Sequence, residues 1–122
     1  MIDDKWKKIS QFVKKRDSYN CSLLIKLSKK EQKELKKNAG RFIRELDSAH
    51  VFRKSRYPHI KYNPEFIIIL NRYSHSMLDS NKDPITGKSI SKEEVKEWWI
   101  FIVGEKKYNK LYNMLEKRKT NE

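Results

Sequence analysis

Residues 66–80, FIIILNRYSHSMLDS, decide the expected fold, because they join an apolar strand to a short polar helix. The run from Phe66 to Asn71 is rich in β-forming residues and has the length of a strand. His75 and Asp79 follow it four residues apart, so they share one face of a helix that begins just after the strand. The sequence therefore predicts a strand that delivers a histidine and a carboxylate from its end.

The only other segment rich in β-forming residues is RFIREL, residues 41–46. The stretch between the two segments, residues 47–65, has the prolines and polar residues of a long loop. We expect a two-stranded antiparallel hairpin, with His50 at the end of its first strand. The hairpin and the helix would then bring His50, His75 and Asp79 into one cleft.

Helices are expected on both sides of this hairpin, on the evidence of apolar spacing and of Ser-x-x-Glu capping boxes. One of them has a broad apolar face that includes Trp98 and Trp99, so we expect it to be the main helical contributor to the core. The predicted class is α+β and mostly helical, as one domain over residues 1–122. It consists of a core at about 14–86 and flanking helices over 3–16 and 91–117. Within these parts we expect a basic surface helix with a narrow apolar face over 28–40, and a last helical segment over 105–119.

The charge balance points to a polyanionic partner. The chain has 29 basic and 16 acidic residues, a net charge of +13 and a pI near 9.8, which favours nucleic acid. No apolar run approaches the eighteen residues of a spanning helix, and residues 1–5 do not resemble a signal peptide. We therefore expect no membrane partner and a cytoplasmic location. The single cysteine, Cys21, excludes an internal disulfide.

The predicted cleft has the residues of a hydrolytic metal site. His75 and Asp79 can hold one divalent ion, such as magnesium, manganese, nickel or zinc, and leave positions for water and phosphate. His50 would be the general base, because a neutral imidazole can take a proton from water that attacks phosphorus. This chemistry is phosphodiester hydrolysis.

On these residues the chain resembles the HNH nucleases of the ββα-metal superfamily. The resemblance rests on the Asp-Ser-Ala-His step that ends at His50, on NPEFIIILNRYSH, and on Asp79 four residues after His75. It implies a ββα-metal core, and a DNA endonuclease of phage or mobile-element type that acts in recombination, junction resolution or nicking. A phage protein would act in the bacterial host cell. Symmetric cutting of two strands would require a homodimer.

The resemblance also concerns a structural zinc site. Residues 14–21, KKRDSYNC, are similar to the Arg-Asp-x-x-x-Cys opening that precedes the first Cys-x-x-Cys of zinc-supported members. In this chain Leu24, Asn71 and Ser74 stand where three of the four cysteines would be, and only Cys21 remains. We therefore expect no structural zinc, and we expect packing of the segment around Cys21 under the strands to replace it.

Two further departures concern the catalytic residues. Ala49 stands next to the predicted base, where many members have a metal ligand, so Asp47 would compensate by ligating the ion or by fixing the tautomer of His50. Phe66 stands where the family has its middle asparagine. Asn63, three residues earlier, is the catalytic candidate in its place, and it would hold the loop that presents His50.

Basic residues in the loop after His50 are the candidate phosphate contacts: Arg53, Lys54, Arg56 and Lys61. Two other functions remain open beside the nuclease. One is an HNH-like nucleic-acid-binding module whose nuclease site has decayed, and the other is a basic protein that docks on an acidic protein partner.

Overall fold

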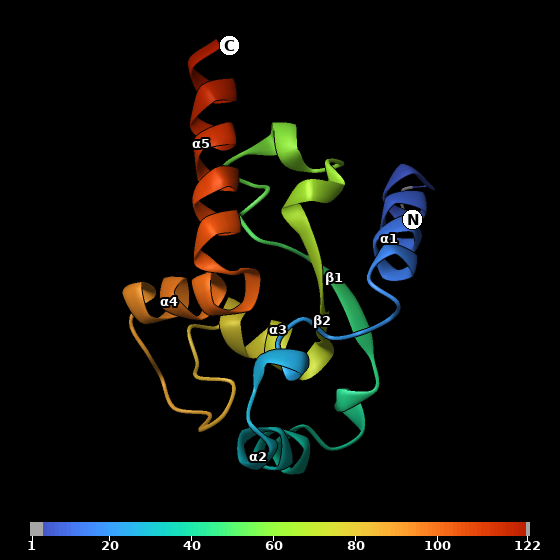
Figure 1. Ribbon diagram of the computed structural model, residues 1–122, viewed down its shortest axis with the longest axis vertical. Helices are drawn as coiled ribbons and strands as arrows, with labels where there is room; N and C mark the ends of the chain where they lie inside the picture. The colour runs from blue at the N-terminus through green and yellow to red at the C-terminus, as the bar shows by residue number, and fades with distance from the viewer. Residues whose placement is uncertain (1–3, 122) are drawn as a thin grey trace.

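A two-stranded antiparallel hairpin lies between helices from the two ends of the chain (Figure 1). The structure is a computed structural model that describes residues 4–121, and the side chains of residues 4–115. Its elements, in chain order, are α1 (Asp4–Arg16), α2 (Lys29–Ala39), β1 (Leu46–His50), β2 (Ile67–Asn71), α3 (Arg72–Asp79), α4 (Lys92–Val103) and α5 (Glu105–Asn121). The predicted α+β class, mostly helical with a hairpin and a short helix after it, is confirmed.

The first strand lies further along the chain than RFIREL, where it is predicted. Residues Gly40–Ile43 form a 3-10 turn, and β1 consists of LDSAH, in register from Leu46 opposite Asn71 to His50 opposite Ile67. LDSAH has no β-branched residue, so local propensity does not mark it as a strand. Pairing with the fully buried β2 determines its position instead.

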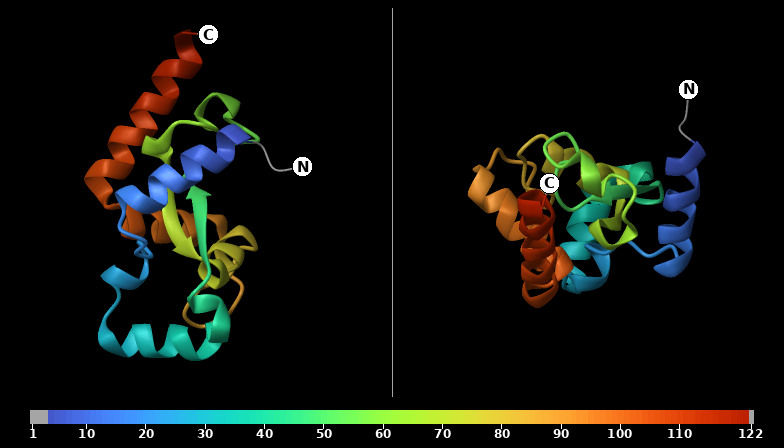
Figure 2. Two further views of the ribbon diagram at one scale, coloured as in Figure 1. Left: turned by 90° about the vertical axis from the view of Figure 1, so that its right-hand side faces the viewer. Right: turned by 90° about the horizontal axis from the view of Figure 1, so that it is seen from above.

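The core has two layers, because successive residues of β2 point to opposite faces of the hairpin. Ile67 and Ile69 pack against Val13 of α1, which crosses the hairpin on that side (Figure 2). Ile68 and Leu70 face the larger layer, which includes residues of α2, α3, α4 and α5. The hairpin is therefore held from both faces, while within residues 4–121 the outer edge of β1 has no partner strand.

The helix boundaries follow the capping signals. Capping boxes are present at Ser28 and Ser91, and Gly40, with φ of +57°, ends α2. The helix predicted over 3–16 is present as α1, although its first predicted residue, Asp3, lies outside the described residues. Over residues 4–121, no helix has the length and apolarity needed to cross a membrane.

The prediction that the helix with two tryptophans is the main helical contributor to the core is wrong. Within α4 only Ile102 is fully buried, and Trp98 and Trp99 are half-buried at the margin of the core. Leu111 and Leu115 of α5 are completely buried. The broad apolar face of α4 is therefore shared between the core and the surface.

Candidate active site beside the edge of β1

A cleft of about 880 Å³ runs along the outer edge of β1. Residues of α1, of β1, of the loop after β1 and of α3 line it, so it joins parts of the chain that are up to about seventy residues apart. The lining residues are Trp6, Ser10, Lys14, Leu46, Asp47, Ser48, His50, Arg53, Lys54, Ser55, Arg72, His75 and Asp79. The cleft thus contains the predicted base and all three predicted metal-site residues.

His50 ends β1, and its imidazole has a fixed hydrogen-bond partner. Its Nε2 lies 2.9 Å from the backbone carbonyl oxygen of Lys61. A carbonyl only accepts, so Nε2 carries a proton and donates it. In the neutral ring Nδ1 is then the acceptor. The hypothesis that Asp47 fixes this tautomer is wrong, because Lys61 does so through its backbone.

The surroundings of His50 favour the neutral imidazole. Burial lowers its pKa below the ordinary value of 6.5, and the hydrogen bond to the Lys61 carbonyl opposes this shift. The charges of Lys54, His75 and Lys61 lower the pKa further. A proton acceptor is therefore available in the cleft at neutral pH.

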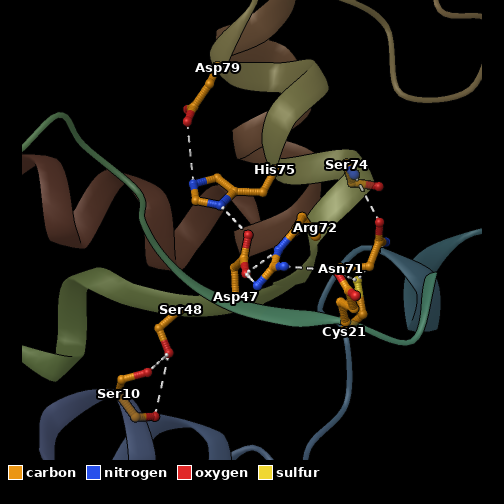
Figure 3. Close-up of polar contacts among 10 residues, drawn as sticks. Ser10, Cys21, Asp47, Ser48, Asn71, Arg72, Ser74, His75 and Asp79 are labelled. Carbon is orange, nitrogen blue, oxygen red and sulfur yellow. Dashed lines mark hydrogen bonds and ion pairs between the residues drawn. The ribbon is translucent and has the colours of Figure 1, made fainter. Parts of the chain in front are cut away.

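Asp47 orients His75, not His50. Its Oδ2 lies 3.0 Å from His75 Nδ1, and its Oδ1 accepts from Arg72 Nε and Nη2, each at 3.2 Å (Figure 3). Arg72 Nη1 also donates to Glu45 at 2.8 Å. Both carboxylate oxygens of Asp47 are thus occupied, and a carboxylate on one imidazole nitrogen is the usual support for a histidine that ligates a metal.

The side chains of His75 and Asp79 face each other in a geometry that favours a cation between them. The Nε2 atom of His75 lies 3.5 Å from Asp79 Oδ2, one turn along α3 (Figure 3). Because Nδ1 donates to Asp47, a neutral His75 has a lone pair on Nε2, and Asp79 also offers only lone pairs. A proton or a metal ion between the two atoms would remove this conflict. Ligands about 2.0–2.2 Å from one ion lie roughly 3.0–3.5 Å apart, so the pair fits a shared divalent cation.

The ligand set is small. Among the side chains of residues 4–115, no group of three or more His, Cys, Asp or Glu residues is arranged to hold a metal ion. His75 and Asp79 would therefore be two protein ligands, with Asp47 behind His75. Such a set suits an ion that keeps several water or phosphate ligands.

Several predicted site residues lie elsewhere. Asn63 does not line the cleft, and its side chain accepts from the Glu65 amide at 3.0 Å to cap a 3-10 turn before β2. It stabilises the turn close to Lys61, whose carbonyl holds His50. Of the four candidate phosphate contacts, Arg53 and Lys54 line the cleft, whereas Arg56 and Lys61 do not.

Two positions at which the sequence departs from the predicted HNH pattern are buried. Ala49 and Phe66 are 1% and 2% exposed, so both side chains belong to the core and neither faces the cleft. A metal ligand at position 49 or an asparagine at position 66 would therefore require a different strand geometry here.

The N-terminal helix contributes residues that sequence inspection missed. The Trp6 ring is stacked on His50, with centroids 5.0 Å apart and 19° between the planes. Ser10 and Ser48 join their hydroxyl oxygens at 2.8 Å, and Lys14 also lines the cleft. The helical spacing of Trp6 marked it as part of an apolar face, and nothing local signals its contact with a residue forty-four positions away.

Three of the four positions that the resemblance to HNH nucleases aligns with zinc-ligating cysteines, Cys21, Asn71 and Ser74, are joined by hydrogen bonds, whereas the fourth, Leu24, packs partly buried against the core. Cys21 Sγ accepts from the backbone and side-chain nitrogens of Asn71, at 3.3 and 3.4 Å, and Asn71 Oδ1 accepts from the Ser74 amide at 2.8 Å (Figure 3). All three residues are buried, and so is Leu23. This cluster ties the segment after α1 to the start of α3, and therefore supports the helix that presents His75.

Comparison of the chain with family models, curated proteins and solved structures finds no match.

Proposed function

We propose that the protein is a divalent-metal-dependent DNA endonuclease of the HNH type. The observation that carries the proposal is a single basic-walled cleft with two different histidines. His50 offers an unprotonated nitrogen, and His75 shares with Asp79 a gap suited to a cation. Separate acid-base and cation-binding groups in one cleft are the parts that phosphodiester hydrolysis needs.

The residues divide the chemistry among them. His50 Nδ1 takes a proton from the water that attacks phosphorus, and the Lys61 carbonyl stabilises the imidazolium that forms. A divalent ion held by His75 and Asp79 would supply Lewis-acid stabilisation of the charge on the phosphate and on the leaving oxygen. Asp47 keeps His75 oriented. Arg53 and Lys54 hold neighbouring phosphates of the strand.

A plasmid-nicking assay tests this function. Supercoiled DNA should be nicked with manganese or magnesium, and EDTA should stop the reaction while the melting temperature of the protein changes little. DNA binding without cleavage in the presence of magnesium, manganese, nickel or zinc would favour a module that binds DNA but whose nuclease site has decayed. Absence of DNA binding at moderate salt would favour a basic protein that docks on an acidic partner.

The pH dependence of cleavage should reflect the lowered pKa of His50. The neutral imidazole is the active form, so activity is present above its pKa and is lost as pH falls through it. Because burial lowers this pKa, the acid limb of kcat/KM should have its midpoint below pH 6.5. A midpoint at or above 6.5, measured at saturating metal, would contradict the assigned base.

Neutralising the basic side chains that line the cleft should weaken DNA binding only through the loss of phosphate contacts. Changing Arg53 or Lys54 to Gln should reduce the slope of log affinity against log salt by about 0.7–0.9, because each true phosphate contact releases counterions. Lys33→Gln, on the exposed face of α2, is the matched control and should change the slope much less. Equal changes at both places, measured by fluorescence anisotropy, would indicate binding by a diffuse positive field.

A further inference from the structure

One wall of the cleft is formed by α1, a helix outside the part of the chain that resembles HNH nucleases. This helix crosses one face of the hairpin (Figure 2). Its Trp6 indole covers the His50 imidazole nearly in parallel, at 5.0 Å and 19°. Both rings are half-buried, and both line the cleft.

The second half of the helix is anchored to the hairpin and to the turn before β2, so Trp6 projects from a helix that is fixed in place. Val13 is completely buried against β2, and Ser10 bonds to Ser48 in the middle of β1. Arg16 donates to the carbonyl oxygens of Pro64 and Ile67, at 2.8 and 2.9 Å. These contacts place the indole at a defined position relative to β1.

We propose that Trp6 is a positioning residue for His50, which makes α1 part of the reaction centre. This inference rests on the proposed function for its kinetic consequence. The hydrogen bond to the Lys61 carbonyl fixes one point of the imidazole but still permits the ring to tilt about that point. The stacked indole opposes that tilt, because a tilted imidazole would lose contact with the face of the indole.

The indole also keeps water from one face of the imidazole. Three cationic or titratable groups act on His50, namely Lys54 and Lys61 of the loop and His75 of α3, and all of them disfavour the imidazolium. Lys54 Nζ itself lies 5.7 Å from the centre of the Trp6 ring. Trp6 thus adds desolvation to a site whose charges already favour a neutral base.

Nuclear magnetic resonance of the histidine rings tests the geometry without any substrate. The tautomer and titration of His50 should be measured in the wild type and in the Trp6→Phe and Trp6→Leu variants. Leucine preserves apolar burial but cannot stack. We expect the Nε2-protonated tautomer alone in the wild type and with phenylalanine. With leucine we expect a mixed tautomer and a pKa moved up toward 6.5.

Cleavage kinetics test the consequence. Trp6→Leu should lower kcat by about 10–100-fold with little change in KM, and Trp6→Phe should recover most of the rate. Phe12→Ala is the matched control, since Phe12 is on the same helix and 54% exposed. Its kcat should stay close to that of the wild type.

The two measurements separate the possible failures. An unchanged His50 tautomer and titration in Trp6→Leu would overturn the positioning role, whether or not the protein cleaves DNA. If the His50 resonances change in Trp6→Leu but the wild type cleaves no DNA, the positioning role is retained and the nuclease function is rejected. Melting curves for each variant show whether loss of folding is the cause. If Trp6→Leu does not fold, the same measurements on Trp6→Phe are compared with those on the wild type.

Discussion

Replacing His50 by alanine will lower the rate of DNA cleavage by about a hundred- to ten-thousand-fold and leave DNA affinity nearly unchanged. A general base acts in the transition state and contributes little to ground-state binding. Among the side chains of residues 4–115, His50 forms no ion pair, and its hydrogen bond is to the Lys61 backbone. Single-turnover cleavage and anisotropy on the same DNA measure the two effects.

A second histidine provides the control for this experiment. His59 lies in the same loop region but does not line the cleft, so His59→Gln should cleave like the wild type. The variant His50→Ala loses one hydrogen bond, which costs about 1 kcal/mol, and the stacking contact with Trp6, which costs about 0.5–1.5 kcal/mol, and it should remain folded. Comparable cleavage by His50→Ala and the wild type would rule out the mechanism.

The parts of the fold that the sequence predicts well are those determined locally. The run before Asn71 and the helix after it follow from an apolar segment and a four-residue spacing, and both are present. The capping boxes at Ser28 and Ser91 are equally local, because a side chain bonds a backbone amide three residues away.

The parts that sequence inspection misses depend on pairing between distant segments. The strand LDSAH is defined by β2, and the partner of His50 Nε2 is a backbone carbonyl, which no residue type signals. Arg72 was missed for a related reason. It is the first residue after β2, and only the register of the hairpin brings it beside Asp47 and Glu45. Residue identity therefore suggested the members of the site, whereas strand register determines their partners.

The second large effect expected is on metal affinity. His75→Ala should weaken manganese binding at least about 100-fold, because it removes one of the two protein ligands proposed among the side chains of residues 4–115. This loss should exceed the roughly 10–100-fold cost of losing a residue that only supports a ligand. Asp79→Asn should weaken it as well, since the carboxylate supplies the negative charge next to Nε2. Isothermal titration calorimetry without DNA measures both, with His59→Gln and Glu97→Gln as controls for loss of a histidine and of a charge.

The same titration distinguishes the two roles open to Asp47. In the structure both of its carboxylate oxygens are engaged, by Arg72 and by His75 Nδ1, so Asp47 would act on the proposed ion only through His75. Asp47→Asn retains an oxygen that can accept from Nδ1 but loses the charge, and it should weaken binding by about 10–100-fold, less than His75→Ala. A loss as large as that of His75→Ala would mean that Asp47 leaves Arg72 and ligates the ion directly. Unchanged affinity in all three variants would show that the metal does not bind between His75 and Asp79.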